Sequence, residues 1–145
     1  MKKVLIIDDD QLVANIYGNR FEVEGYQVQM AFDGEAGLKL LKSFRPDAVI
    51  LDLMLPKITG VELVKIVRAQ PDFAKVPIII LSNSYNSRMV QDALDAGATK
   101  CLSKDDSTPR QLVETVRSAI AGSGAPAPTT DADRRAVTGK TAPKR

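Results

Sequence analysis

The sequence predicts an α/β protein in which helices cover both faces of a parallel sheet. Two observations lead to this class. Apolar runs such as Ala48–Leu51 and Ile78–Leu81 show no polar alternation, which is typical of strands buried on both faces of a parallel sheet. Between these runs lie stretches whose apolar residues recur at helical spacing, so that strand and helix alternate five times along the chain.

Five segments are expected to form the strands of the sheet. They are Lys3–Ile7, Tyr26–Ala31, Ala48–Asp52, Pro77–Ser82 and Thr99–Ser103. The second segment is the most polar and is expected at an edge. Right-handed crossovers leave few ways to connect five parallel strands. We therefore predict a flavodoxin-like (βα)5 three-layer sandwich with strand order 2-1-3-4-5.

A helix is expected after each strand, because the stretch that follows each strand has apolar residues at helical spacing along one face. Asp10 and Asp33 are placed to cap the first two helices, and Gly25 and Gly97 to end the first and the fourth. Gly18, inside the first helix, costs about 1 kcal/mol relative to alanine. The residues expected to face the core are Val13, Ile16, Tyr17, Phe21, Ala36, Gly37, Leu40, Leu41, Phe44, Val61, Val64, Val67, Met89, Val90, Ala93, Leu94, Leu112, Val113, Val116, Ala119 and Ile120.

Composition indicates a globular protein and no membrane insertion. Of the 145 residues, 44% are hydrophobic and 26% are charged. No apolar run approaches the roughly 20 residues of a membrane span. The first apolar run stops at Ile7 against three aspartates, which argues against a signal peptide. The single cysteine, Cys101, excludes an internal disulfide and suits a reducing compartment, so a cytoplasmic location is expected.

The folded domain is expected to span residues 1–121, and residues 122–145 to form a disordered tail. This tail is rich in Ala, Pro, Thr and charged residues and has no periodic apolar face. Its charge is +3, and because the whole chain carries +2, the rest of the chain carries −1. A near-neutral body argues against a nucleic-acid-binding domain, so direct DNA binding is not expected.

Polar side chains follow four of the expected strands at the point where each strand ends. Asp8 and Asp9 follow the first strand, Asp52 ends the third, Ser82 ends the fourth and Lys104 follows the fifth. In a 2-1-3-4-5 sheet these ends meet at one edge, where open α/β sheets bind their ligands. Each residue alone also has a structural interpretation, as a cap, a turn residue or a solvated charge. Their joint placement favours a site.

Three carboxylates at one edge repel one another unless cations offset their charge. Lys104 supplies one positive charge. Because the chain contains no histidine, a metal ion there would be held by oxygen atoms, as Mg²⁺ prefers. Such a site is suited to phosphoryl transfer, in which one carboxylate attacks phosphorus while the cations and a hydroxyl stabilise the equatorial oxygens.

The motifs around these residues resemble the receiver domain of two-component response regulators. They are Ile6-Ile7-Asp8-Asp9, Asp52-Leu53-Met54-Leu55-Pro56 with Gly60 downstream, Leu81-Ser82 and Ser103-Lys104. The resemblance covers about Lys2 to Ala121. It implies that Mg²⁺ is bound by Asp9, Asp52 and the backbone carbonyl of Met54, with Asp8 acting through a water molecule.

The resemblance also implies a role in a phosphorelay. Asp52 would accept a phosphoryl group from the phosphohistidine of a sensor histidine kinase or a phosphotransfer protein. Lys104 would contact this group, and Ser82 would move to hydrogen-bond it. The chain would be a stand-alone signalling module that assists its own phosphorylation and dephosphorylation, acts through a partner protein and is not a turnover enzyme.

Two other interpretations stay open. A small Mg²⁺-dependent phosphatase would use Asp52 as its nucleophile. That mechanism requires a second acidic residue close after the nucleophile, where this chain has Leu53 and Met54. A docking module would keep the fold with an altered or phosphorylation-independent switch. Cys101 stands where the resembled family usually has an aromatic residue and Asp105 where it usually has proline, so an altered switch is expected.

Overall fold

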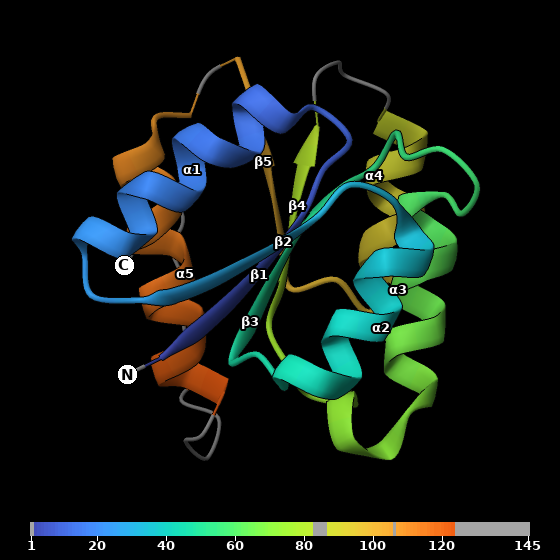
Figure 1. Ribbon diagram of the computed structural model, residues 1–145. Helices are drawn as coiled ribbons and strands as arrows, with labels where there is room; N and C mark the ends of the chain where they lie inside the picture. Colours follow the sequence, from blue (N-terminus) through green and yellow to red (C-terminus); the bar gives the residue numbers. More distant parts are fainter. Residues whose placement is uncertain (1, 83–86, 106, 124–145) are drawn as a thin grey trace.

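Five parallel strands form one sheet in the order β2-β1-β3-β4-β5, which confirms the predicted fold class (Figure 1). The strands are β1 (Lys3–Ile7), β2 (Gln27–Ala31), β3 (Ala48–Asp52), β4 (Ile78–Ser82) and β5 (Lys100–Ser103). The computed structural model describes residues 2–82, 87–105 and 107–123. The polar strand β2 lies at an edge, as its sequence predicts, and β1, β3 and β4 occupy the centre.

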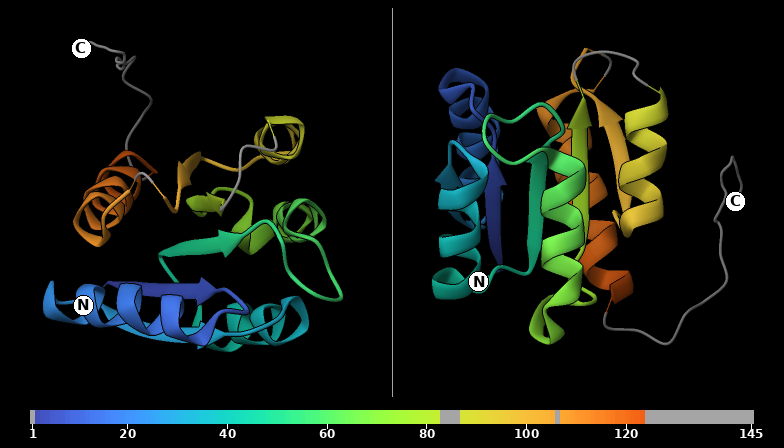
Figure 2. Two further views of the ribbon diagram at one scale, coloured as in Figure 1. Left: turned by 90° about the horizontal axis from the view of Figure 1, so that it is seen from above. Right: turned by 90° about the vertical axis from the view of Figure 1, so that its right-hand side faces the viewer.

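Helices on both faces of the sheet give the molecule three layers (Figures 1 and 2). On one face lie α1 (Gln11–Val23) and α5 (Pro109–Ser123). On the other face lie α2 (Gly34–Phe44), α3 (Gly60–Ala69) and α4 (Ser87–Ala96). The right-hand view of Figure 2 shows these three helices side by side. A short 3-10 helix, η1 (Pro71–Phe73), follows α3 and has no counterpart in the sequence prediction. No helix within the described residues has the length and apolar character of a membrane span.

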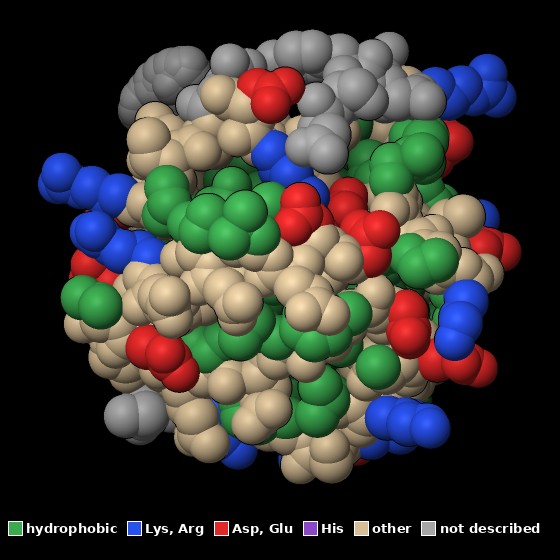
Figure 3. Space-filling view, turned by 45° about the horizontal axis from the view of Figure 1, so that its top comes forward, with side chains coloured by type: hydrophobic (Ala, Val, Ile, Leu, Met, Phe, Trp, Pro, Cys, Tyr) green, Lys and Arg blue, Asp and Glu red, His purple; other side chains and the backbone are tan. Residues whose placement is uncertain are grey.

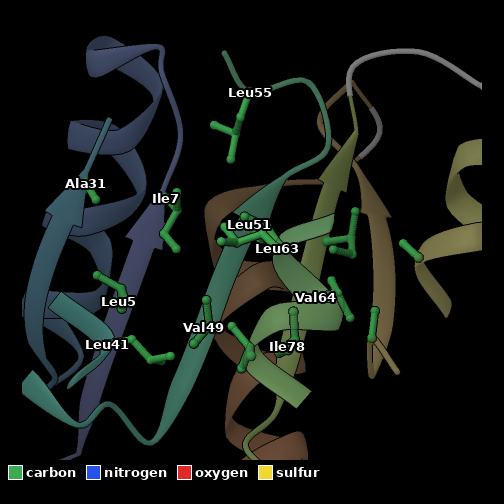
Figure 4. Packing of buried hydrophobic residues seen from close by; sticks show 14 of the residues in the cluster. Leu5, Ile7, Ala31, Leu41, Val49, Leu51, Leu55, Leu63, Val64 and Ile78 are labelled. Atoms are coloured by element: carbon green, nitrogen blue, oxygen red, sulfur yellow. The ribbon is translucent and has the colours of Figure 1, made fainter. Parts of the chain in front are cut away.

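Alternate residues of the central strands fill two separate cores. In β1, Leu5 and Ile7 belong to the core beneath α2 and α3, which Figure 4 shows, and Val4 and Ile6 belong to the core beneath α1 and α5. β3 and β4 continue the same alternation. Both faces of these strands are therefore apolar, which explains why their sequences show no polar alternation.

The expected capping residues begin and end the helices. Asp10 and Asp33 accept hydrogen bonds from backbone N–H groups in the first turns of α1 and α2. Gly25 and Gly97 follow α1 and α4 with φ angles of 93° and 121°, in the left-handed region that glycine enters without strain. These boundaries confirm the sequence prediction.

Two details of the helices differ from the expectation. Ile16 is 49% exposed instead of facing the core, because Tyr17 and Phe21 form the buried stripe of α1 and Ile16 lies to one side of it. α5 continues to Ser123, so the last two residues of the helix fall within the segment expected to be a tail. The rest of that segment, residues 124–145, lies outside the described residues.

α3 begins directly against the end of β3, and Gly60 makes this approach possible. The Gly60 N–H donates to the Leu53 carbonyl oxygen at 3.0 Å. A Cβ atom at Gly60 would lie 2.7 Å from the Leu53 Cα and 2.8 Å from the Asp52 carbonyl oxygen. Both are backbone atoms, which cannot turn aside as a flexible side chain can. Gly60 therefore sets how closely α3 approaches the carboxyl end of β3.

Two glycine-to-alanine substitutions should change stability in opposite directions. Gly60→Ala should lower the free energy of unfolding by about 1–3 kcal/mol because of the backbone clash. Gly18→Ala should raise it by about 0.5–1 kcal/mol, because alanine favours the helix. At Gly18 an added Cβ would be no closer than 3.5 Å to its nearest neighbours, the side chains of Met30 and Val28. Urea unfolding measures both changes, and an equal loss in both variants would contradict this account.

Candidate functional site

Asp8 and Asp52 lie side by side at the carboxyl edge of the sheet. β1 and β3 are adjacent, and their register pairs Ile7 with Leu51, so the next residue along each segment is an aspartate. Both aspartates are buried, and Asp9, the third predicted carboxylate, is exposed beside them. Each of the three can place one carboxylate oxygen within 4.8 Å of the others.

Lys104 and Ser82 reach this edge from the neighbouring strands. β4 and β5 pair Ser82 with Ser103, and the Lys104 N–H donates to the Ser82 carbonyl oxygen at 2.9 Å. The Ser82 side chain is buried at the end of β4. The parallel register thus brings all the predicted polar residues to one edge of the sheet.

The Lys104 ammonium lies between the two buried aspartates. Its Nζ is 2.7 Å from Asp8 Oδ2 and 3.3 Å from Asp52 Oδ2, and the lysine side chain is only 7% exposed. A buried charge is tolerated when opposite charges and hydrogen bonds compensate for lost hydration. Figure 3 shows acidic side chains gathered beside a basic one in the upper half of the view, with hydrophobic side chains next to them.

Backbone N–H groups hold the remaining oxygens of the two aspartates. Asp8 Oδ1 accepts from the Asp10 N–H at 2.9 Å, and Asp52 Oδ1 accepts from the Met54 N–H at 3.1 Å. Asp8 Oδ2 is buried and accepts no well-aligned hydrogen bond from the described residues, although the Lys104 ammonium forms a close ion pair with it. This oxygen therefore retains capacity to bind a cation.

The pKa values of Asp52 and Lys104 are both shifted by burial and by the neighbouring charges. Burial raises the pKa of Asp52 above its ordinary value and the Asp8 charge adds to the rise, while the Met54 N–H and the Lys104 ammonium oppose it. Burial alone would lower the pKa of Lys104, but its contacts with Asp8 and Asp52 outweigh this effect and leave the pKa above its ordinary value. Lys104 is thus held in its charged form.

The aspartates also fit a hard divalent cation. Every side chain that could bind it offers oxygen, the ligand that Mg²⁺ prefers. Three carboxylates face a single ammonium, so additional positive charge would be stabilising there. The incompletely satisfied Asp8 Oδ2 supplies a buried acceptor at the same place. The chemistry of the donor set therefore suits Mg²⁺.

The structure adds to this edge a residue that the sequence prediction assigned only to the core. Tyr17 of α1 is buried and lines a hollow of about 240 Å³ together with Lys104. Tyr17 follows the capping Asp10 by about two helical turns, so the two lie on the same side of α1. No local pattern relates Tyr17 to the site, because Asp10 caps the helix and does not line the hollow.

The two departures from the resembled family lie on β5 and directly after Lys104. Cys101 is half-buried and packs against the core beneath α2 and α3. The Asp105 N–H donates to Ser103 Oγ at 3.3 Å, and the peptide bond between Lys104 and Asp105 is trans. The backbone on either side of Lys104 is therefore held by hydrogen bonds.

Comparison with known proteins agrees with this architecture. Residues 4–117 match the family model of the response regulator receiver domain. The chain is 35% identical to the response regulator MprA of Mycolicibacterium vanbaalenii over 102 residues, which cover 70% of this chain and 43% of that protein. It is also 35% identical to the DNA-binding dual master transcriptional regulator RpaA of Synechocystis over 104 residues, which cover 72% of this chain and 43% of that protein. The chain thus spans less than half the length of these curated relatives.

Solved structures share the fold. The chemotaxis protein CheY4 of Vibrio cholerae matches with a TM-score of 0.77 and 32% identity, covering 82% of this chain and 98% of that one. The receiver domain of the Francisella response regulator 1452 matches with a TM-score of 0.75 and 30% identity, covering 83% and 98%. Receiver domains are signalling modules, and this chain belongs to the response regulator receiver domain family.

Lys104→Met should destabilise the fold, because it leaves two buried carboxylates without their shared cation. In metal-free buffer we expect the free energy of unfolding to fall by about 1–3 kcal/mol. Lys100→Met, at an exposed position of β5, the strand that Lys104 follows, is the matched control and should change the free energy of unfolding by less than about 0.5 kcal/mol. Urea unfolding measures both, and added Mg²⁺ should recover part of the loss in Lys104→Met. Equal effects of the two substitutions would show that Lys104 does not balance the aspartates.

Proposed function

We propose that this receiver domain accepts a phosphoryl group on Asp52 and signals through a partner protein. The donor is the phosphohistidine of a sensor histidine kinase or of a phosphotransfer protein. The observation that carries the proposal is that Asp52, at the buried end of a central strand, shares the Lys104 ammonium with Asp8. Membership of the receiver domain family supports the same role.

Asp52 is the nucleophile of the proposed reaction. One of its carboxylate oxygens attacks phosphorus and forms an O–P bond, while the P–N bond to the donor's imidazole breaks and leaves its electron pair on nitrogen. The Lys104 ammonium offsets the negative charge of the phosphoryl oxygens, and the Ser82 hydroxyl donates a hydrogen bond to one of them. Catalysis of this step is mainly positioning and charge stabilisation.

Mg²⁺ is the cofactor in this proposal. The residues that would hold it are Asp9, Asp52 and the backbone carbonyl of Met54, with Asp8 acting through a water molecule. When bound, the ion would supply positive charge that offsets the charges of the carboxylates and the phosphoryl oxygens. The buried Asp8 and Asp52 are held in place by backbone N–H groups, and the exposed Asp9 completes the set from the solvent side.

The alternative functions have less support. A phosphatase with Asp52 as nucleophile needs an acid to protonate the leaving group, but the next two residues are the buried Leu53 and the exposed Met54, neither of which is an acid. A docking module that is independent of phosphorylation would have no need of a lysine buried between two aspartates. The proposal therefore describes a cytoplasmic signalling module, one that is not a turnover enzyme and that contacts its kinase and its downstream partner as proteins.

Asp52→Asn should accept no phosphoryl group, because an amide is not a nucleophile in this reaction. The intact mass is measured after incubation with acetyl phosphate and Mg²⁺. The wild-type chain should gain one phosphoryl group. Asp10→Asn is the matched control, since asparagine caps a helix as well as aspartate does, and it should gain one as well.

Each alternative function gives a different result in this experiment. An adduct on Asp52→Asn would contradict the assignment of the acceptor. Continuous turnover of many phosphorylated substrates would support a phosphatase. A wild-type chain that forms no adduct would support the docking module.

Phosphorylation should reorder the loops at Asp52 and Ser82 but move α4 and β5 little. Cys101 is too small to fill or vacate the volume of the aromatic ring usual in this family. Burial of a large side chain is worth about 1.5–3 kcal/mol, and this contribution to the preference between states is missing here. Amide chemical shifts with and without beryllofluoride compare the residues beside Asp52 and Ser82 with Met89–Leu102. Equally large changes in both regions would show that the chain switches without the ring. In the variant Cys101→Tyr, which restores a ring, the chemical-shift changes of Met89–Leu102 should be larger than in the wild-type chain.

A further inference from the structure

Asp8 Oδ2 is the atom for which Lys104 and a divalent cation would compete. The Lys104 Nζ lies 2.7 Å from this oxygen. A cation held by the three aspartates, through a direct bond or a water molecule at Asp8, brings a second positive charge to the same place, where the two repel. Lys104 would then give up Asp8 and keep Asp52, whose Oδ2 lies at 3.3 Å. A buried ammonium would thereby lose one of its two acceptors.

A phenol lies in the hollow beside Lys104. Tyr17 is 7% exposed, and its ring packs in the core beneath α1 and α5. Among the described residues, none forms a hydrogen bond with the Tyr17 hydroxyl. The hydroxyl is not one of the fully buried unpaired atoms of the described residues, so it opens into the hollow. The phenol oxygen is therefore available as an acceptor within a hollow that Lys104 also lines.

Two further observations relate this phenol to the ammonium. Leu102 of β5 packs in the same core as Tyr17, and Lys104 follows two residues later, so the chain leads from that core to the hollow that Tyr17 and Lys104 both line. Burial raises the pKa of the Tyr17 phenol, the Lys104 charge opposes the rise, and the Asp8 charge adds to it. Tyr17 is thus close enough to sense the charges of both partners of the ion pair.

We infer that Tyr17 is a positioning residue for Lys104, whose ammonium donates a hydrogen bond to the phenol oxygen when a divalent cation takes over the Asp8 carboxylate. The inference rests on the proposed function, because it requires Mg²⁺ at the three aspartates. The exchange of acceptors keeps the ammonium beside Asp52, where it meets the phosphoryl group, instead of letting it turn out into solvent.

The walls of the hollow suit this arrangement. The residues that line it besides Tyr17 and Lys104 are Val13, Ile16, Ser107 and Pro109. Most of these side chains are apolar and can cover the aliphatic stem of the lysine, while the charged end needs a polar acceptor. Phenylalanine would cover the stem as well as tyrosine does but would offer no acceptor.

The test compares Tyr17→Phe with Tyr26→Phe. Both substitutions remove one phenol oxygen from a buried tyrosine, but Tyr26 packs against Phe21 and lines a different hollow, with Lys2. Titration with Mg²⁺ alone, followed by amide chemical shifts, should give a dissociation constant about three- to tenfold higher for Tyr17→Phe and unchanged for Tyr26→Phe. Without Mg²⁺, Tyr17→Phe should keep the wild-type amide spectrum away from residue 17, because Lys104 then has both aspartates as acceptors.

The Nζ resonance of Lys104 gives a second readout. In the Mg²⁺-bound state the ammonium protons of the wild-type chain should exchange slowly with water, and those of Tyr17→Phe should exchange faster. Three results would overturn the inference and leave the proposed function intact. They are the same exchange rate in the wild-type chain and Tyr17→Phe, an unchanged Mg²⁺ affinity in Tyr17→Phe, and an equal weakening of Mg²⁺ binding in Tyr17→Phe and Tyr26→Phe. A wild-type chain that does not bind Mg²⁺ would overturn both.

Discussion

A lysine buried between two aspartates is the interaction on which the functional edge of this protein depends. Lys104 follows β5, Asp52 ends β3 and Asp8 follows β1, so their ion pairs link the ends of strands across the sheet. None of the three charges would be stable there alone, because each has given up much of its hydration. A cation or anion that entered this edge would therefore change the partners of Lys104.

The rest of the fold holds these charges in place. The central strands are apolar on both faces, so the two cores fix their register, and a shift of one residue would turn every side chain to the opposite face. Gly60 brings the start of α3 against the end of β3. The carboxylates of Asp8 and Asp52 are thus attached to rigid strand ends. Several of the polar groups around them lie in the turns that follow the strands.

Much of this arrangement could be predicted from local patterns. The apolar runs identified the strands, and Asp10, Asp33 and Gly25 marked helix boundaries that the structure confirms. The meeting of Asp8, Asp52, Ser82 and Lys104 followed from a topological rule, because parallel strands end at one edge. Periodicity places the exposed Ile16 in the core, because it finds the apolar stripe of a helix but not the outer limits of that stripe.

Other features depend on contacts that no local pattern records. Arg68, for example, donates to the carbonyl oxygens of Gly97 and Phe73 at 2.9 and 3.0 Å, which joins α3 to the end of α4 and to η1. In sequence Arg68 is only one basic residue near the end of a helix. Its hydrogen bonds exist because α3 and α4 pack side by side on the same face of the sheet.

The sequence by itself determined the α/β class, the strand order and the set of polar residues at the carboxyl edge. These depend on short-range periodicity and on the few topologies open to parallel strands. Only the tertiary structure decided that Lys104 pairs more closely with Asp8 than with Asp52 and that Tyr17 shares its hollow. The ion-pair distances depend on how the chain turns after β1 and β5, and the hollow depends on how α1 packs beside the start of α5. The spacing of residues along the chain carries no information about distances between segments so far apart.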